Sequence, residues 1–118
     1  MEAPNLLATT TVTGKTSLVT LSTVTSNVIT NSTNSGTVSK LNCIVLSNYT
    51  SSAVSANVMV NRSATVYYVG GTVAIPANST LVLLGKDTSL YLEEGDVLQA
   101  SVSANSSVSM SASYELMS

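Results

Sequence analysis

Short runs of alternating apolar and polar residues, repeated along the chain, are the feature that most constrains how this sequence folds. In the clearest run, residues 54–60, four apolar residues alternate with Ser55, Asn57 and Met59. A period of two places successive side chains on opposite faces of a β-strand. No long segment shows the 3.6-residue period of a helix, and helix-forming residues never cluster. The chain is therefore predicted to be all-β.

Eight or nine short strands follow from these runs and from the turn residues between them. The predicted strand segments are 18–21 with 28–30, 41–45, 54–60, 65–69, 72–75, 81–84, 89–92, 97–103 and 108–114. We expect Gly70 and Gly71 to form a hairpin turn. The spacing indicates a two-sheet antiparallel β-sandwich with a core of Val, Leu, Ile and Ala. Periodicity does not report connectivity, so a jelly-roll and an immunoglobulin-like strand order both remain open.

The length of 118 residues fits one domain. We assign residues 15–118 to the sandwich and residues 1–14 to an N-terminal arm, either frayed or extended along a partner's sheet edge. The single cysteine excludes an internal disulfide, and Cys43 is predicted to be a small buried hydrophobe. The opening residues lack the pattern of a secretory signal, and no apolar run approaches the length of a membrane helix. Synthesis in the cytoplasm is the expectation.

The residue inventory argues against an enzyme. The chain has no His and only 8% charged residues, whereas Ser and Thr fill 37 of 118 positions. General acid–base catalysis usually recruits His or paired carboxylates, and a nucleophilic Ser needs a base. Four scattered cations and a net charge of -2 cannot follow a phosphate backbone, so nucleic acid is not an expected partner, and neither is a membrane. We assign no catalytic, cofactor-binding or metal-binding residue.

One acidic cluster could hold calcium through its carboxylates: Glu93, Glu94 and Asp96, with Asp87 a few residues earlier. The spacing of an EF-hand loop is missing. We therefore favour an acidic turn whose charges stay in water, with Gly95 adopting a positive φ.

Two further features could mark contact sites. Tyr67 and Tyr68 are adjacent, so one is expected in the core and the other on the surface, where it could contact a neighbouring subunit or a sugar. Five Asn-x-Ser/Thr triplets could suggest glycosylation. Because Ser and Thr are so abundant, about three such triplets arise by chance, and we give no weight to Asn31, Asn48, Asn61, Asn78 and Asn105.

The strand edges favour an assembly. Residues 66–69 and 81–84 have high β-propensity and no charge, so exposed edges there would promote aggregation. An oligomer would bury such edges, and a homotrimer is the simplest form.

The C-terminal half carries a family resemblance. The segments Ile75-Pro-Ala-Asn-Ser-Thr-Leu-Val-Leu-Leu-Gly85, Leu90-Tyr-Leu-Glu-Glu-Gly-Asp-Val-Leu98, 100–104 and Ser113-Tyr-Glu115 resemble small virion structural proteins of tailed bacteriophages, especially phages of cyanobacteria. The resemblance covers about residues 38–117. It implies an oligomeric accessory component of the particle, without catalytic residues, whose partners are the major capsid protein or other virion proteins.

A capsid decoration or cement protein of the virion is therefore the expected function. A neck, tail or fibre-associated structural protein remains an alternative. A glycan-binding adhesive module is the alternative from another class, although the chain has no Trp and few Tyr to stack on sugar rings.

Overall fold

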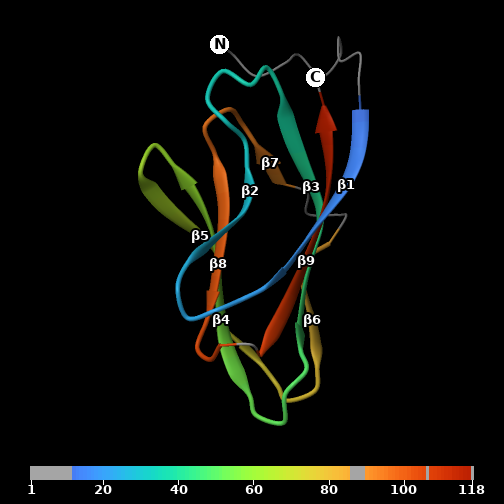
Figure 1. The fold of residues 1–118 in the computed structure, drawn as a ribbon, viewed down its shortest axis with the longest axis vertical. Helices are drawn as coiled ribbons and strands as arrows, with labels where there is room; N and C mark the ends of the chain where they lie inside the picture. The colour runs from blue at the N-terminus through green and yellow to red at the C-terminus, as the bar shows by residue number, and fades with distance from the viewer. Residues whose placement is uncertain (1–11, 86–89, 106, 118) are drawn as a thin grey trace.

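The described part of the chain, residues 12–85, 90–105 and 107–117 of a computed structural model, forms two antiparallel β-sheets packed face to face (Figure 1). The nine strands are β1 (Val12–Thr20), β2 (Ser26–Thr30), β3 (Val38–Asn48), β4 (Val54–Arg62), β5 (Thr65–Ile75), β6 (Thr80–Leu84), β7 (Leu90–Leu92), β8 (Val97–Val102) and β9 (Val108–Met117). The predicted β-sandwich of eight or nine strands is confirmed. Residues 1–11 of the predicted arm lie outside the described residues, and Val12 to Gly14 already belong to β1.

The strand order answers the question of connectivity. One sheet has the order β1-β9-β3-β6, with β7 also paired to β3, and the other has the order β2-β8-β4-β5. The pairs β1–β9, β2–β8, β3–β6/β7 and β4–β5 are nested around a single central turn at Ser63-Ala64. The chain is thus one long antiparallel ribbon rolled so that successive pairs fall in opposite sheets. This is the jelly-roll arrangement rather than an immunoglobulin-like order.

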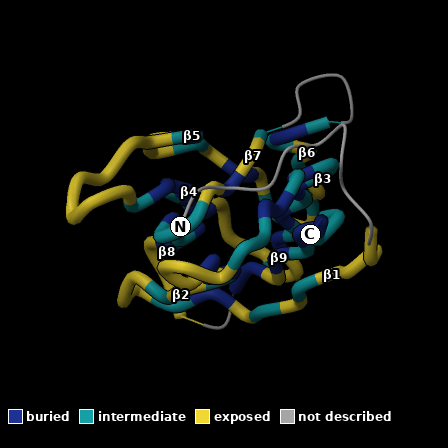
Figure 2. The backbone as a smooth tube through the Cα atoms, turned by 90° about the horizontal axis from the view of Figure 1, so that it is seen from above, coloured by how far each residue is buried: buried dark blue, intermediate teal, exposed yellow. Residues whose placement is uncertain are grey.

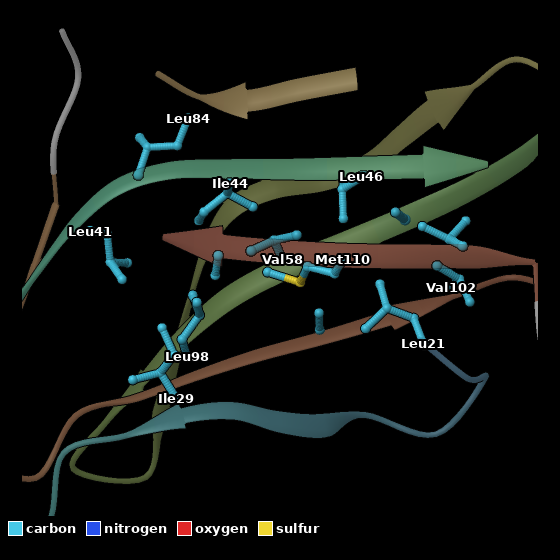
Figure 3. Packing of buried hydrophobic residues seen from close by; sticks show 14 of the residues in the cluster. Leu21, Ile29, Leu41, Ile44, Leu46, Val58, Leu84, Leu98, Val102 and Met110 are labelled. Atoms are coloured by element: carbon cyan, nitrogen blue, oxygen red, sulfur yellow. The ribbon is translucent and has the colours of Figure 1, made fainter. Parts of the chain in front are cut away.

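The core lies between the two sheets and is aliphatic (Figure 3). The apolar face predicted for residues 54–60 of β4 is confirmed as buried, and Val58, Leu98 of β8 and Ala112 of β9 are all essentially inaccessible to water. Methionine contributes more than the sequence suggested, because Met110 is fully buried at the centre of the core. Sulfur-containing side chains fill irregular gaps that branched residues leave.

A β-bulge at Asn42 changes which residues of β3 face the core. Leu41 pairs with Tyr114 of β9 and Cys43 with Ser113, so Asn42 is an extra residue without a partner in that register. Leu41 points inward before the bulge and Ile44 points inward after it. The prediction that Cys43 is buried was therefore wrong, because the bulge turns its side chain to the outer face, where it is half-buried.

The glycine pair does not form the predicted hairpin turn. Gly70 and Gly71 lie inside β5, where two register shifts relative to β4 each add one residue to β5. The turn between β4 and β5 is instead Ser63-Ala64, and both residues have positive φ, at 52° and 64°. Two consecutive positive φ values are the geometry of a type I′ hairpin, which usually carries Asn-Gly. Sequence reasoning gave too much weight to glycine and missed a turn made of residues with side chains.

Ala64→Gly should therefore stabilise the protein by about 0.5–1 kcal/mol. Glycine removes the strain that a Cβ atom imposes at positive φ, and this gain exceeds the extra entropy of the unfolded chain. Ala74→Gly, in the adjoining strand β5 and without positive φ, is the matched control and should cost about 0.5–1 kcal/mol. Urea unfolding of the two variants tests this, and a destabilised Ala64→Gly protein would contradict the strained turn.

Candidate functional site

The outer face of the β1-β9-β3-β6 sheet is the first surface to consider, and we call it the hydroxyl face. Strand pairing aligns three rows of uncharged side chains across this face, and a further row beyond them contains Lys40 and Glu115. The uncharged rows are Thr20-Ser109-Ser47-Thr80, Leu18-Ser111-Val45-Val82 and Thr16-Ser113-Cys43. An apolar row therefore lies between two rows made mostly of hydroxyl side chains, and none of these side chains carries a charge.

The apolar row is open to solvent at both ends. Leu18 is 76% exposed on β1 and Val82 is 59% exposed on β6. A shallow hollow of about 350 Å³ lies between β1, β9 and β3, bordered by Leu18, Val45 and Ser111. Three uncharged rows with exposed aliphatic side chains at their centre have the composition of a protein contact surface.

The second surface surrounds the hairpin of β4 and β5, which projects from the body of the sandwich (Figures 1 and 2). Tyr67 pairs with Val60 and Tyr68 with Met59, so the two rings do point to opposite faces of β5. Both are nevertheless exposed, at 59% and 64%. The prediction that one of them lies in the core was wrong, because β5 is the edge strand of its sheet and has both faces in water here, whereas Met59 and Val60 of the neighbouring β4 are buried.

A groove of about 610 Å³ lies between this hairpin and β7, and we call it the tyrosine groove. Its lining residues are Val60 and Arg62 of β4, Tyr67, Tyr68 and Val69 of β5, and Leu90 and Tyr91 of β7. At Gly70 the two layers are close, since a Cβ atom there would lie 2.9 Å from Cδ1 of Leu83 in β6. The groove lies along the part of the hairpin between Gly70 and the Ser63-Ala64 turn. Three of the five tyrosines of the chain therefore meet at one place.

An ion cluster closes one end of the tyrosine groove. Arg62 donates from Nε to Oδ1 of Asp96 (2.8 Å), from Nη2 to Oδ2 of Asp96 (2.6 Å), and from Nη2 to Oε2 of Glu93 (2.9 Å). The hydrogen bond with Asp96 is the main reason that the pKa of Arg62 rises further above its ordinary value. Asp96 is almost completely buried, so the prediction that this acidic turn stays in water fails for it.

The remaining acidic residues do not converge on one point. Gly95 has a φ of +90°, as predicted for this turn. Glu94 turns away from Asp96 and accepts a hydrogen bond from the backbone N–H of Gly36 at 2.8 Å. Within the described ranges, no group of three or more His, Cys, Asp or Glu side chains could hold a metal ion. Asp87, the fourth member of the predicted cluster, lies outside the described residues.

Two asparagines of the Asn-x-Ser/Thr triplets have structural roles. Asn31 donates from Nδ2 to the carbonyl oxygens of Thr37 and Leu92, and its Oδ1 accepts from the hydroxyl of Ser35. Asn48 likewise donates from Nδ2 to backbone carbonyl oxygens, those of Ser52, Ile75 and Pro76, and its Oδ1 accepts from the backbone N–H of Thr50. Both side chains are buried, which leaves their amide nitrogens inaccessible in the folded protein. The decision to give these triplets no weight is consistent with that burial at Asn31 and Asn48.

Sequence reasoning singled out Tyr67 and Tyr68 but missed Tyr91 and Arg62 as members of the same site. The strand pairings of the jelly roll bring these residues together from separate parts of the chain, and no local motif marks them. In the described part of the chain, no helix is long and apolar enough to span a membrane.

Comparisons of the chain with protein-family models and with curated proteins find no match. The structure therefore defines the class of protein at the level of its fold: an all-β jelly roll with three uncharged rows of side chains on one outer face and a groove bordered by tyrosines.

Proposed function

We propose that this protein is a non-enzymatic structural component of a tailed-phage virion, a capsid decoration or cement protein that attaches through the hydroxyl face. The observation that carries this proposal is the set of three uncharged rows on the outer face of the β1-β9-β3-β6 sheet, with Leu18 and Val82 exposed in the central row. Jelly rolls occur in viral capsid proteins, which supports the proposal by analogy of fold. The resemblance of residues 38–117 to small virion proteins points in the same direction.

Burial of the hydroxyl face is the proposed mechanism of attachment. Most of its side chains are Ser, Thr and Val, which lose little rotamer entropy when a partner covers them. With no charge among the three rows, no ion has to be desolvated without a partner. Stable interfaces remove on the order of 800 Å² from each partner. The three rows would form the centre of such an interface, and side chains on the flanking strands would form its polar rim.

The proposed partners are the subunits of the shell and further copies of this chain, most simply in a trimer. A decoration protein that bridges neighbouring shell subunits would resist the outward pressure of the packaged genome. A position at the neck, the tail or a fibre would use the same face against a different virion protein. The particle is accordingly the proposed location of the protein.

Substitutions on the hydroxyl face test this proposal. Leu18→Lys and Val82→Lys place a charge in the central row, and each should weaken binding to shells of the cognate phage by about tenfold or more, because the charge must be desolvated. Val24→Lys is the matched control, since Val24 is equally exposed but lies in the turn between β1 and β2. Co-sedimentation with expanded and unexpanded shells measures the effect. Equal loss in all three variants, or equal binding to both kinds of shell, would count against a decoration role.

The only cysteine gives an independent measurement of the same interface. Cys43 lies in the third row of the hydroxyl face and is half-buried, so its thiol should react with a maleimide in the free monomer. Docking through this face should slow that reaction in proportion to the bound fraction. Light scattering across a dilution series, performed in parallel, separates self-association from binding to the shell. Unchanged thiol reactivity in a bound or oligomeric form would place the contact elsewhere.

A further inference from the structure

We propose that the tyrosine groove is a binding site for a neutral saccharide. This inference goes beyond the proposed structural role and does not depend on the hydroxyl face, which uses none of the same residues, although β7 of the groove pairs with β3 of that sheet. The groove volume of about 610 Å³ lies within the usual range for small-ligand sites. Its lining combines aromatic rings, an aliphatic floor and one charged end.

The tyrosines provide surfaces on which the apolar face of a sugar ring can stack. Tyr67 and Tyr91 stand on different strands at the groove, and both rings are substantially exposed in the described structure. A tyrosine ring offers an apolar face together with a hydroxyl group at its end. None of the hydrogen bonds among the described residues uses the hydroxyl groups of Tyr67, Tyr68 or Tyr91. These groups can therefore donate to, or accept from, the hydroxyls of a ligand.

The ion cluster at the end of the groove selects for a neutral ligand. One arginine against two carboxylates leaves a local charge of about -1, which disfavours sialylated or sulfated sugars. Arg62 uses Nε and Nη2 for its two carboxylate partners, and no hydrogen bond in the described structure occupies Nη1. The side chain of Glu93 is 58% exposed beside it. The guanidinium group of Arg62 can donate to one hydroxyl of a sugar while the carboxylate of Glu93 accepts from the neighbouring hydroxyl.

The arrangement of the rings argues against an organic cation as the ligand. A cage for a quaternary ammonium group needs several rings that close around one point. Tyr67 and Tyr68 are neighbours on one strand and point to opposite faces, so they cannot close in this way. The ring of Tyr68 instead lies over Gly71, where a Cβ atom would be 3.8 Å from the ring. The hairpin thus presents a platform that suits an extended ligand.

Titration of the full-length protein with cellotetraose and with maltotetraose tests the inference. The chain contains no Trp, so its near-ultraviolet emission comes from five tyrosines, and stacking of a sugar should change that emission directly. We expect saturable binding to a neutral oligosaccharide, either one of these or another on a printed glycan array. Tyr67→Ala and Tyr91→Ala should each weaken it by about tenfold. Tyr49→Ala is the matched control, because Tyr49 is 52% exposed but does not line the groove.

The outcomes separate this inference from the proposed function. Loss of saccharide binding in the Tyr67 and Tyr91 variants, with shell binding retained, supports a sugar site beside a separate docking face. Binding that survives both substitutions, binding restricted to acidic glycans, or no binding to any neutral glycan at about 10 mM would overturn it. Loss of shell binding in the Tyr67 variant, with no glycan bound, would assign the groove to a protein partner instead. All three tyrosines are exposed, so unchanged circular dichroism should accompany each variant.

Discussion

Asn48→Asp should lower the free energy of unfolding by about 4 kcal/mol or more, the largest effect that we expect from a single substitution in this protein. Asn48 is 1% exposed, and its Nδ2 donates to the carbonyl oxygens of Ser52 (2.9 Å), Ile75 (3.2 Å) and Pro76 (3.1 Å). Its Oδ1 accepts from the N–H and the hydroxyl of Thr50. Aspartate would place a carboxylate oxygen against three carbonyl oxygens without any donor between them.

Two further substitutions separate charge from the loss of hydrogen bonds. Asn48→Ala removes the donors without adding a charge and should cost about 3 kcal/mol, because buried carbonyl groups are left without partners. Asn27→Asp is the matched control, since Asn27 is exposed on β2 and uses only its oxygen, which accepts from Gln99. It should cost less than about 0.5 kcal/mol. Urea unfolding monitored by circular dichroism gives all three values, and similar stabilities for the two aspartate variants would refute a structural role for Asn48.

Arg62→Met should destabilise the protein by about 3 kcal/mol. Asp96 is buried, and after the substitution its carboxylate would keep only the hydrogen bond from the backbone N–H of Glu93. Arg62 itself is half exposed, but its removal leaves the buried carboxylate of Asp96 without a cationic partner, which costs more than the pair itself contributes. Methionine retains most of the length of the arginine side chain, so water gains little new access to Asp96.

The remaining members of the ion cluster give the controls. Glu93→Gln should cost less than about 1 kcal/mol, because both side chains of the Arg62–Glu93 pair are about half exposed and screened by water. The double variant Arg62→Met/Asp96→Asn should recover a large part of the stability lost in Arg62→Met. Chemical unfolding of the wild type, Arg62→Met, Asp96→Asn and the double variant forms a double-mutant cycle. Additive effects at positions 62 and 96 would show that the pair is not energetically coupled.

The regular parts of the strands could be predicted from the sequence because their burial follows the period of two. In β4, for example, Val54, Ala56 and Val58 are all buried as the alternation indicates. The prediction failed where the period is broken. At Asn42 one inserted residue moves Cys43 to the outer face, and in β5 two inserted residues place Gly70 and Gly71 inside a strand. A bulge reverses every face after it, and residue type alone does not locate it.

The candidate sites were harder to predict because they depend on pairing between distant segments. Arg62 and Asp96 are 34 positions apart, and only the jelly-roll order brings the end of β4 beside the turn before β8. The exposure of both Tyr67 and Tyr68 depends on the position of β5 as the edge strand of its sheet, which is a property of the strand order. The three rows of the hydroxyl face likewise require the register of four strands.

The nested pairing of the strands has a consequence for the order in which the protein folds. Only β4 and β5 are joined by a two-residue turn, whereas β1 and β9 meet across nearly the whole length of the chain. Closing the large loops costs entropy before distant strands can contact each other, so folding should begin at the Ser63-Ala64 turn and end with the outermost pair. A relaxed turn in Ala64→Gly should then accelerate folding more than it slows unfolding. The same hairpin that presents the tyrosines would thus set the rate at which the whole sandwich forms.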